Sequence, residues 1–140
     1  METTNFNRLL AELKELQLLI GEFALCGSAP MAARGLRDSH DLDIVVSEQI
    51  YQKLQIQYSD EEYKSPLGFL RIRNLEISNT WMNDITEAKN IIAEAEIIND
   101  LPFAPLKYVI DYKQMLNRQK DLIDLQLIEE YLLQEKSWVI

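Results

Sequence analysis

The chain has 140 residues, of which 47% are hydrophobic and 26% are charged, and its formal net charge at pH 7 is −9. That composition is typical of a globular domain and unlike that of a disordered chain. The negative charge opposes non-specific binding to DNA, RNA or anionic membranes. No apolar run approaches the roughly 18 residues of a spanning helix, and the N-terminus lacks the pattern of a secretory signal, so we expect a cytoplasmic protein.

The first part of the chain predicts a helix, a strand, a short helix and a second strand. Apolar residues from Phe6 to Ile20 recur at helical spacing. The short apolar run Glu22–Cys26 reads as a buried strand, with Cys26 as a small buried hydrophobe. Pro30 falls in the first turn of a helix, where its missing N–H costs little, and Leu42–Val46 is rich in β-branched residues. We expect the two strands to be neighbours in one sheet.

The middle of the chain predicts a helix and a strand pair. Ser47 is suited to cap a helix that runs to about Leu54. Phe69–Arg73 and Leu75–Ser78 alternate between apolar and polar residues on either side of Asn74, which can form a turn.

The last part of the chain is mostly helical. Ile85–Ala93 has a helical pattern, and Ala95–Ile98 with Leu101–Phe103 is consistent with a small hairpin. Pro105 opens a long helical segment with a break near residues 117–120.

No repeat or linker divides the sequence, so we expect one domain over residues 1–140. It would consist of an N-terminal helix (1–20), a sheet-containing core (22–104) and C-terminal helices (105–136). Strands interspersed with helices predict an α+β fold with a mixed β-sheet and flanking helices.

Two carboxylates stand at the head of the second strand. Asp41 and Asp43 share one face of that strand because side chains alternate, and such a pair suits a divalent cation that also binds phosphate. The alternative is that Asp41 caps a turn and Asp43 faces solvent. Upstream, Gly27 permits a close backbone approach and Ser28 offers a hydroxyl, which together suit a phosphate, although most Gly-Ser pairs are ordinary turns.

The run from Gly27-Ser28, through twelve residues, to Asp41-Leu42-Asp43-Ile44 resembles the signature of the nucleotidyltransferase fold shared with DNA polymerase β. The segment Gly35–Ser39 resembles the loop before the acids in many small members. A second match lies downstream, where Leu101–Leu106, Lys113 and Arg118–Asp124 resemble the C-terminal helices of minimal and abortive-infection type nucleotidyltransferases. The resemblance covers roughly residues 20 to 130.

The resemblance implies two Mg²⁺ ions held by three acids, Asp41, Asp43 and a third on a later strand. Glu76 is the best candidate for the third acid, and it would also take the acceptor's proton; the alternative is an exposed strand position. The acceptor oxygen would attack the α-phosphorus of a nucleoside triphosphate and release pyrophosphate, with catalysis by positioning and charge stabilisation.

The resemblance also implies that Gly27 and Ser28 hold the β and γ phosphates. Arg37, Lys113 and Lys120 are candidate cations for the triphosphate, together with Arg118. Each has a simpler reading, since Lys120 can pair with Asp124 one turn away and Arg37 can be a solvated loop charge. For His40 a turn or packing role is favoured over a general base, and for Trp81 core packing is favoured over base stacking.

Three functional hypotheses remain at this point. The first is an Mg²⁺-dependent nucleotidyltransferase that transfers NMP, by default AMP from ATP, to a hydroxyl of a small molecule, a protein or an RNA end. The second is an inactive interaction module of the same fold, such as one half of a toxin–antitoxin or regulatory pair, and the third is a structural domain with no nucleotide site. We expect no extended DNA and no membrane as partners, and a homodimer or a partner subunit could complete the acceptor site.

Overall fold

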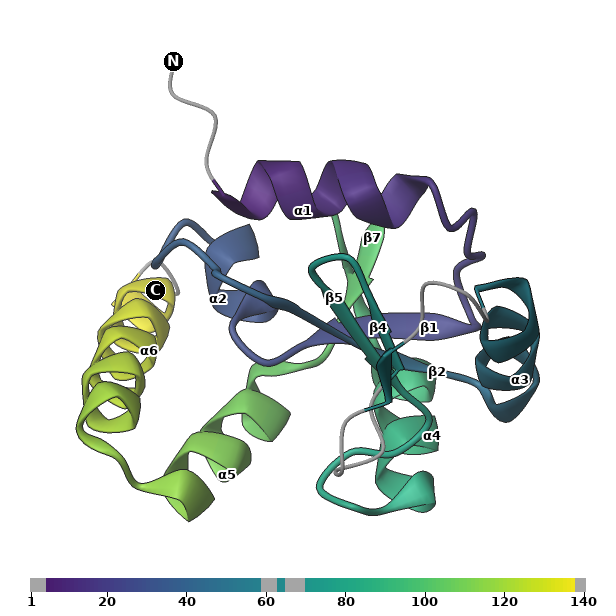
Figure 1. The fold of residues 1–140 in the computed structure, drawn as a ribbon. Coiled ribbons are helices and arrows are strands. Elements are labelled where there is room, and N and C mark those ends of the chain that lie inside the picture. Colours follow the sequence, from purple (N-terminus) through teal and green to yellow (C-terminus); the bar gives the residue numbers. More distant parts are fainter. Residues whose placement is uncertain (1–4, 59–62, 65–69, 138–140) are drawn as a thin grey trace.

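One mixed sheet of seven strands runs through the described residues, which are 5–58, 63–64 and 70–137 of a computed structural model (Figure 1). The strand order is β3-β4-β5-β2-β1-β7-β6. The strands are β1 (Phe23–Cys26), β2 (Leu42–Val46), β3 (Tyr63–Lys64), β4 (Leu70–Ile72), β5 (Leu75–Ser78), β6 (Glu96–Ile98) and β7 (Leu101–Phe103).

The helices are α1 (Asn5–Lys14), α2 (Ala29–Ala33), α3 (Glu48–Gln57), α4 (Ile85–Glu94), α5 (Leu106–Leu116) and α6 (Gln119–Ser137). The central strand β2 runs antiparallel to β1 and parallel to β5. These elements confirm the predicted α+β class with a mixed sheet and a C-terminal helical segment.

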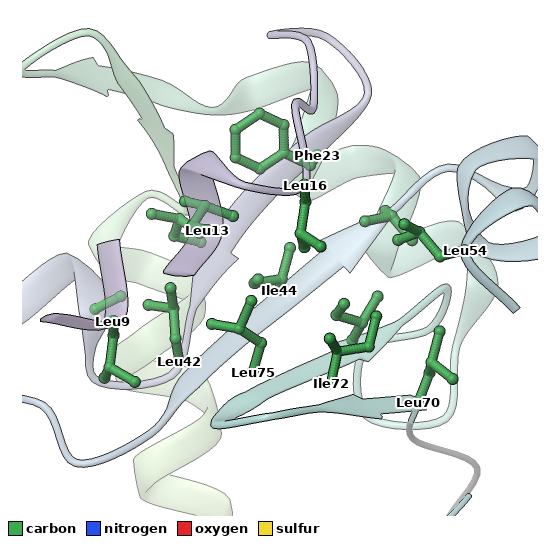
Figure 2. Packing of buried hydrophobic residues seen from close by; sticks show 14 of the residues in the cluster. Leu9, Leu13, Leu16, Phe23, Leu42, Ile44, Leu54, Leu70, Ile72 and Leu75 are labelled. Carbon is green, nitrogen blue, oxygen red and sulfur yellow. The ribbon is translucent and has the colours of Figure 1, made fainter. Parts of the chain in front are cut away.

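Helices cover both faces of the sheet. On one face, Leu9 and Leu13 of α1 pack with Leu42, Ile44 and Leu75 of the central strands (Figure 2). Burial of such side chains is the main force that holds α1 on the sheet, at about 25 cal/mol per Å² of apolar surface.

On the other face, Cys26 and Val45 pack against Ala88 of α4 and Tyr108 of α5. Cys26 is buried as predicted, and burial, with a smaller contribution from the nearby Asp43 carboxylate, raises the pKa of its thiol well above the ordinary value. The thiolate is therefore disfavoured at neutral pH.

The N-terminal helix is shorter than the sequence pattern predicts. It ends at Lys14 rather than near Ile20, and Gln17 adopts a left-handed conformation with φ 55°. Leu13 and Leu16 already fill the core, whereas Leu19 and Ile20 are 66% and 58% exposed. The leucine spacing therefore continues past the point where the chain turns away to reach β1.

The predicted turns and caps are confirmed. The β4–β5 hairpin turns at Arg73 and Asn74, and the β6–β7 hairpin turns at Asn99 and Asp100, which both have positive φ. Asn117, with φ 48°, ends α5 and makes the corner before α6. Phe69, predicted to start a strand, lies outside the described residues. No helix in the described ranges is both long and apolar enough to cross a membrane.

Candidate active site

Charged side chains of three neighbouring strands form one row across the sheet. Asp43 of β2 is paired in register with Glu76 of β5, and Glu76 is paired with Arg71 of β4. Directly paired residues point to the same face, which here is the face on which Cys26 packs against α4 and α5. The row therefore places Asp43 beside Glu76, the acid that the sequence indicates as the third metal ligand.

The environment of Asp43 favours its protonated form. Its pKa is raised to about 7, first by burial, then by a hydrogen bond and charge repulsion from Glu76, and by the charge of Asp41. Lys113 opposes the shift. The Asp43 and Glu76 carboxylates thus share a site in which two full negative charges are costly near neutral pH.

Glu76 has a counter-ion on its other side. Arg71 Nη1 lies 3.0 Å from Glu76 Oε1, and the two side chains are 41% and 26% exposed. The sequence pattern does not single out Arg71, although its alternation with Leu70 and Ile72 in the strand indicates that it points away from the core.

The turn after β1 is pressed against the row. Gly27 has φ +64°, and a Cβ built at this position would overlap Asp43 Oδ2 and lie 3.2 Å from Asp43 Cγ. Only glycine fits both requirements without strain. Ser28 follows before α2 begins, and its hydroxyl makes no capping hydrogen bond. The two halves of the predicted motif, separated by twelve residues, therefore meet in space.

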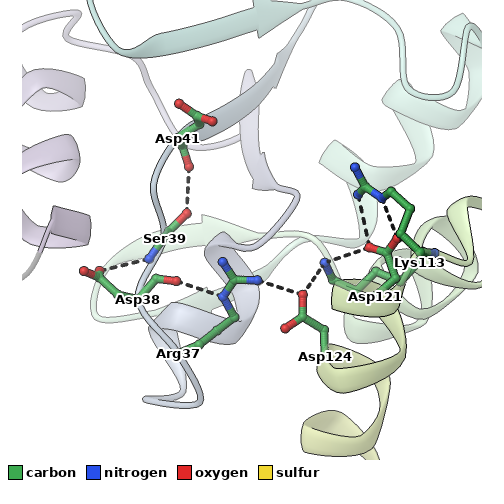
Figure 3. A network of polar contacts seen from close by, with 8 residues as sticks. Arg37, Asp38, Ser39, Asp41, Lys113, Asp121 and Asp124 are labelled. Carbon is green, nitrogen blue, oxygen red and sulfur yellow. Dashed lines mark hydrogen bonds and ion pairs between the residues drawn. The ribbon is translucent and has the colours of Figure 1, made fainter.

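A cluster of ion pairs around the buried side chains of Lys113, Asp121 and Asp124 links α5 and α6 (Figure 3). Lys113 is buried, with Nζ 2.8 Å from Asp124 Oδ2 and 3.9 Å from Asp121 Oδ1. Arg118 Nε lies 2.6 Å from Asp121 Oδ2, and its hydrogen bond is the main cause of the lowered pKa of Asp121. The cluster holds the ammonium group in place without leaving either carboxylate unpaired.

The loop before β2 joins the same cluster through Arg37. Its Nη1 lies 2.7 Å from Asp124 Oδ2, so the predicted loop cation is an ion-pair partner of α6 (Figure 3). The next residue, Asp38, accepts hydrogen bonds from the backbone N–H of Phe6 and Ser39, each at 2.9 Å. The backbone hydrogen bond from Phe6 is the largest cause of the lowered pKa of Asp38. The loop is thereby fixed to the first turn of α1.

These groups enclose a polar pocket of about 330 Å³, a size suited to a small ligand. Seven of the nine candidate site residues line the pocket, while Gly27 lies against Asp43 and Glu76 is the neighbour of Asp43 in the row. The lining residues are Ser28, Arg37, Ser39, His40, Asp41, Asp43, Lys113, Arg118, Lys120, Asp121 and Asp124.

Lys120 does not pair with Asp124, which is taken by Arg37 and Lys113; within the described ranges no ion pair of Lys120 is found. The sequence interpretation does not include Asp121 and Asp124 among the site residues. Their helical spacing could have identified them, because Asp121 and Asp124 lie on the same buried face of α6 as Ile128.

Two further predictions concern side chains near this site. His40 is exposed, and its carbonyl accepts a hydrogen bond from Asn5 Nδ2 at 3.1 Å, which agrees with a turn role. Trp81 packs on Tyr112 with ring centroids 4.9 Å apart, which agrees with a packing role.

A larger pocket, of about 510 Å³, lies at the opposite end of β2, near Val46 and α4, and is mainly apolar.

The donor atoms of the pocket suit a divalent cation in type but do not form a complete cage. Among the described residues, no group of three or more His, Cys, Asp or Glu side chains is arranged to hold a metal ion. The donor chemistry nevertheless fits Mg²⁺, which uses one or two carboxylates together with substrate phosphates and water. The raised pKa of Asp43 marks an excess of negative charge that such a cation would neutralise. Asp43 and Glu76 are the pair best placed to hold it, with Asp41 nearby.

Comparison of the chain with protein-family models, with curated proteins and with solved structures finds no match.

Proposed function

We propose that the protein is a metal-dependent nucleotidyltransferase, which transfers an NMP group, by default AMP from ATP, to a hydroxyl of an acceptor. The observation that carries the proposal is the pocket itself, because it gathers carboxylates, a serine hydroxyl and cations from segments as distant as Ser28 and Lys120. Its lining includes the acids Asp41 and Asp43 and the cations Arg37, Lys113 and Lys120. A metal-bound triphosphate requires both kinds of group.

Each side of the pocket would have its own task. Lys120 and Arg118 would neutralise phosphate oxygens at the mouth, where both side chains are exposed. Ser28 would donate its hydroxyl to a phosphate, and Glu76 would accept the proton of the attacking hydroxyl. The bound metal would polarise the phosphate and stabilise charge that develops on the leaving group.

A second candidate is the inactive interaction module. The contact that favours it is the ion pair of Glu76 with Arg71, because an acid that is permanently held by arginine cannot serve as a metal ligand or as a base. In that case the protein would keep the fold and the pocket, and its partner would be another macromolecule.

Calorimetric titration with a non-hydrolysable ATP analogue, with and without Mg²⁺, tests the proposal. The wild type should bind the analogue only with the metal, and the variant Asp41→Asn plus Asp43→Asn should not bind it. Asp100→Asn is the matched control, since Asp100 is an exposed acid at the β6–β7 turn and should leave binding unchanged. Absence of binding by the wild type, also with GTP, CTP and UTP analogues, would contradict the proposal and favour the interaction module.

A further inference from the structure

Arg71 stands at the end of the charged row and contacts Glu76, the acid that lies between it and Asp43. On one side Glu76 is paired in register with Asp43, and on the other its Oε1 lies 3.0 Å from Arg71 Nη1. The register pairs Arg71 directly with Glu76 across the β4–β5 hairpin, so the contact follows from the strand pairing. The guanidinium group therefore supplies the positive charge nearest to this acid in the row.

The Arg71 pair differs from the buried pairs of the same site. Lys113 and Asp124 are 6% and 5% exposed, and separating them would leave two charges buried without partners. Arg71 and Glu76 are 41% and 26% exposed, so water can solvate either group after they separate. The pair at Glu76 can thus be exchanged at low cost, whereas the pair at Lys113 cannot.

A second contact keeps Arg71 in place during such an exchange. Its Nε donates a hydrogen bond to the carbonyl of Arg73 at 3.3 Å, within the same hairpin. Glu76 can therefore leave the guanidinium group while the arginine side chain stays beside the row.

We propose that Arg71 is a built-in counter-ion that competes with a divalent cation for Glu76. Arg71 neutralises the acid when no metal is bound, and it gives up the acid when a metal binds. The inference rests on the proposed function, since it concerns the same carboxylates. It assigns Arg71 a positioning role that sets the affinity for the metal, and it reconciles the arginine contact of Glu76 with a role as third acid.

The test measures Mn²⁺ affinity by calorimetry and by electron paramagnetic resonance of free Mn²⁺, without nucleotide. An exposed ion pair that must be broken lowers affinity by up to about fivefold, so Arg71→Gln should bind Mn²⁺ about fivefold more tightly than the wild type. Arg71→Lys keeps the positive charge and should give an intermediate affinity. Circular dichroism and thermal unfolding check that each variant is folded.

Arg73→Gln is the matched control, because Arg73 lies in the same hairpin but pairs with Glu15 at 2.6 Å, away from the row. It should bind Mn²⁺ as the wild type does. In a Glu76→Gln background, Arg71→Gln should no longer change the affinity, because the acid for which the two cations compete has been removed.

The outcomes separate the inference from the proposed function. If the wild type binds Mn²⁺ and Arg71→Gln binds it no more tightly, or if Arg73→Gln has the same effect, the counter-ion inference is overturned while the metal site stands. If neither the wild type nor Arg71→Gln binds Mn²⁺ or the Mg²⁺-dependent ATP analogue, both the metal site and the inference are refuted.

Discussion

Replacement of Gly27 by alanine tests the contact between the turn and the carboxylate row, independently of any activity. A left-handed conformation costs alanine about 1–2 kcal/mol, and the loss of glycine's freedom in the unfolded chain offsets about 0.4–1 kcal/mol of this. The new methyl group would also overlap Asp43 Oδ2, which forces the carboxylate out of its place. Displacement of this hydrogen-bonded group adds about 2 kcal/mol, for a total loss of about 3 kcal/mol.

Gly35→Ala is the matched control, because Gly35 has φ +74° and no atom lies within 4 Å of the place that a Cβ would occupy. It carries only the backbone cost, about 1 kcal/mol. Urea unfolding should show this difference, and for a chain of this length each kcal/mol corresponds to roughly 3 °C in Tm. Equal losses for Gly27→Ala and Gly35→Ala would refute the close contact. Partial recovery of Gly27→Ala by Asp43→Ala would support it.

Three further predictions concern the charges of the pocket. Because burial and neighbouring acids raise the pKa of Asp43 to about 7 in the folded state, its stabilising effect is complete below pH 4 and is lost progressively as the pH rises through about 7. Urea unfolding from pH 5 to 8 should therefore show a decline of about 2.5 kcal/mol in the free energy of unfolding, which Asp43→Asn removes. Lys113→Met should lower the free energy of unfolding by about 2 kcal/mol, a loss that is limited because Arg37 still pairs with Asp124. The control Lys107→Met, at an exposed pair with Glu94, should change the free energy of unfolding little. Unchanged stability of the Lys113 variant would contradict a structural role of the cluster. Lys120→Gln should weaken the Mg²⁺-dependent binding of the ATP analogue by about fivefold and leave Tm unchanged. A lower Tm would show instead that Lys120 stabilises the fold.

The parts of the fold that the sequence predicts correctly depend on local patterns. Alternation along Leu42–Val46 identifies the face of Asp43, and the turn residues Asn99 and Asp100 identify the β6–β7 hairpin. The end of α1 is not local, because it depends on where the core is already filled by Leu13 and Leu16. Periodicity alone cannot indicate that Leu19 and Ile20 have nothing to pack against.

The sequence predicts those residues of the candidate site that belong to a motif with a fixed order and spacing. It does not predict which side chains form ion pairs with one another. The sequence indicates Gly27, Asp43 and Glu76 as members of one site, and strand register then brings the two acids together. It predicts the pairing of β4 with β5 but not the register, and the register is what sets Arg71 opposite Glu76. The helical spacing predicts Asp124 as a partner of Lys120, but its partners come from α5 and the loop before β2.

Because of the cluster around Asp124, the pocket forms only when segments from nearly the whole length of the chain are in place. The loop carrying Arg37 is tied to α1 by Asp38, while Lys113 and Asp124 belong to the last two helices. A chain shortened before α6 would have the acids of β2 and β5 but would leave the buried ammonium of Lys113 without its carboxylates. Amide hydrogen exchange at β2 and at the start of α6 should therefore follow the same global opening, so that the pocket assembles and dissolves as one cooperative unit with the fold.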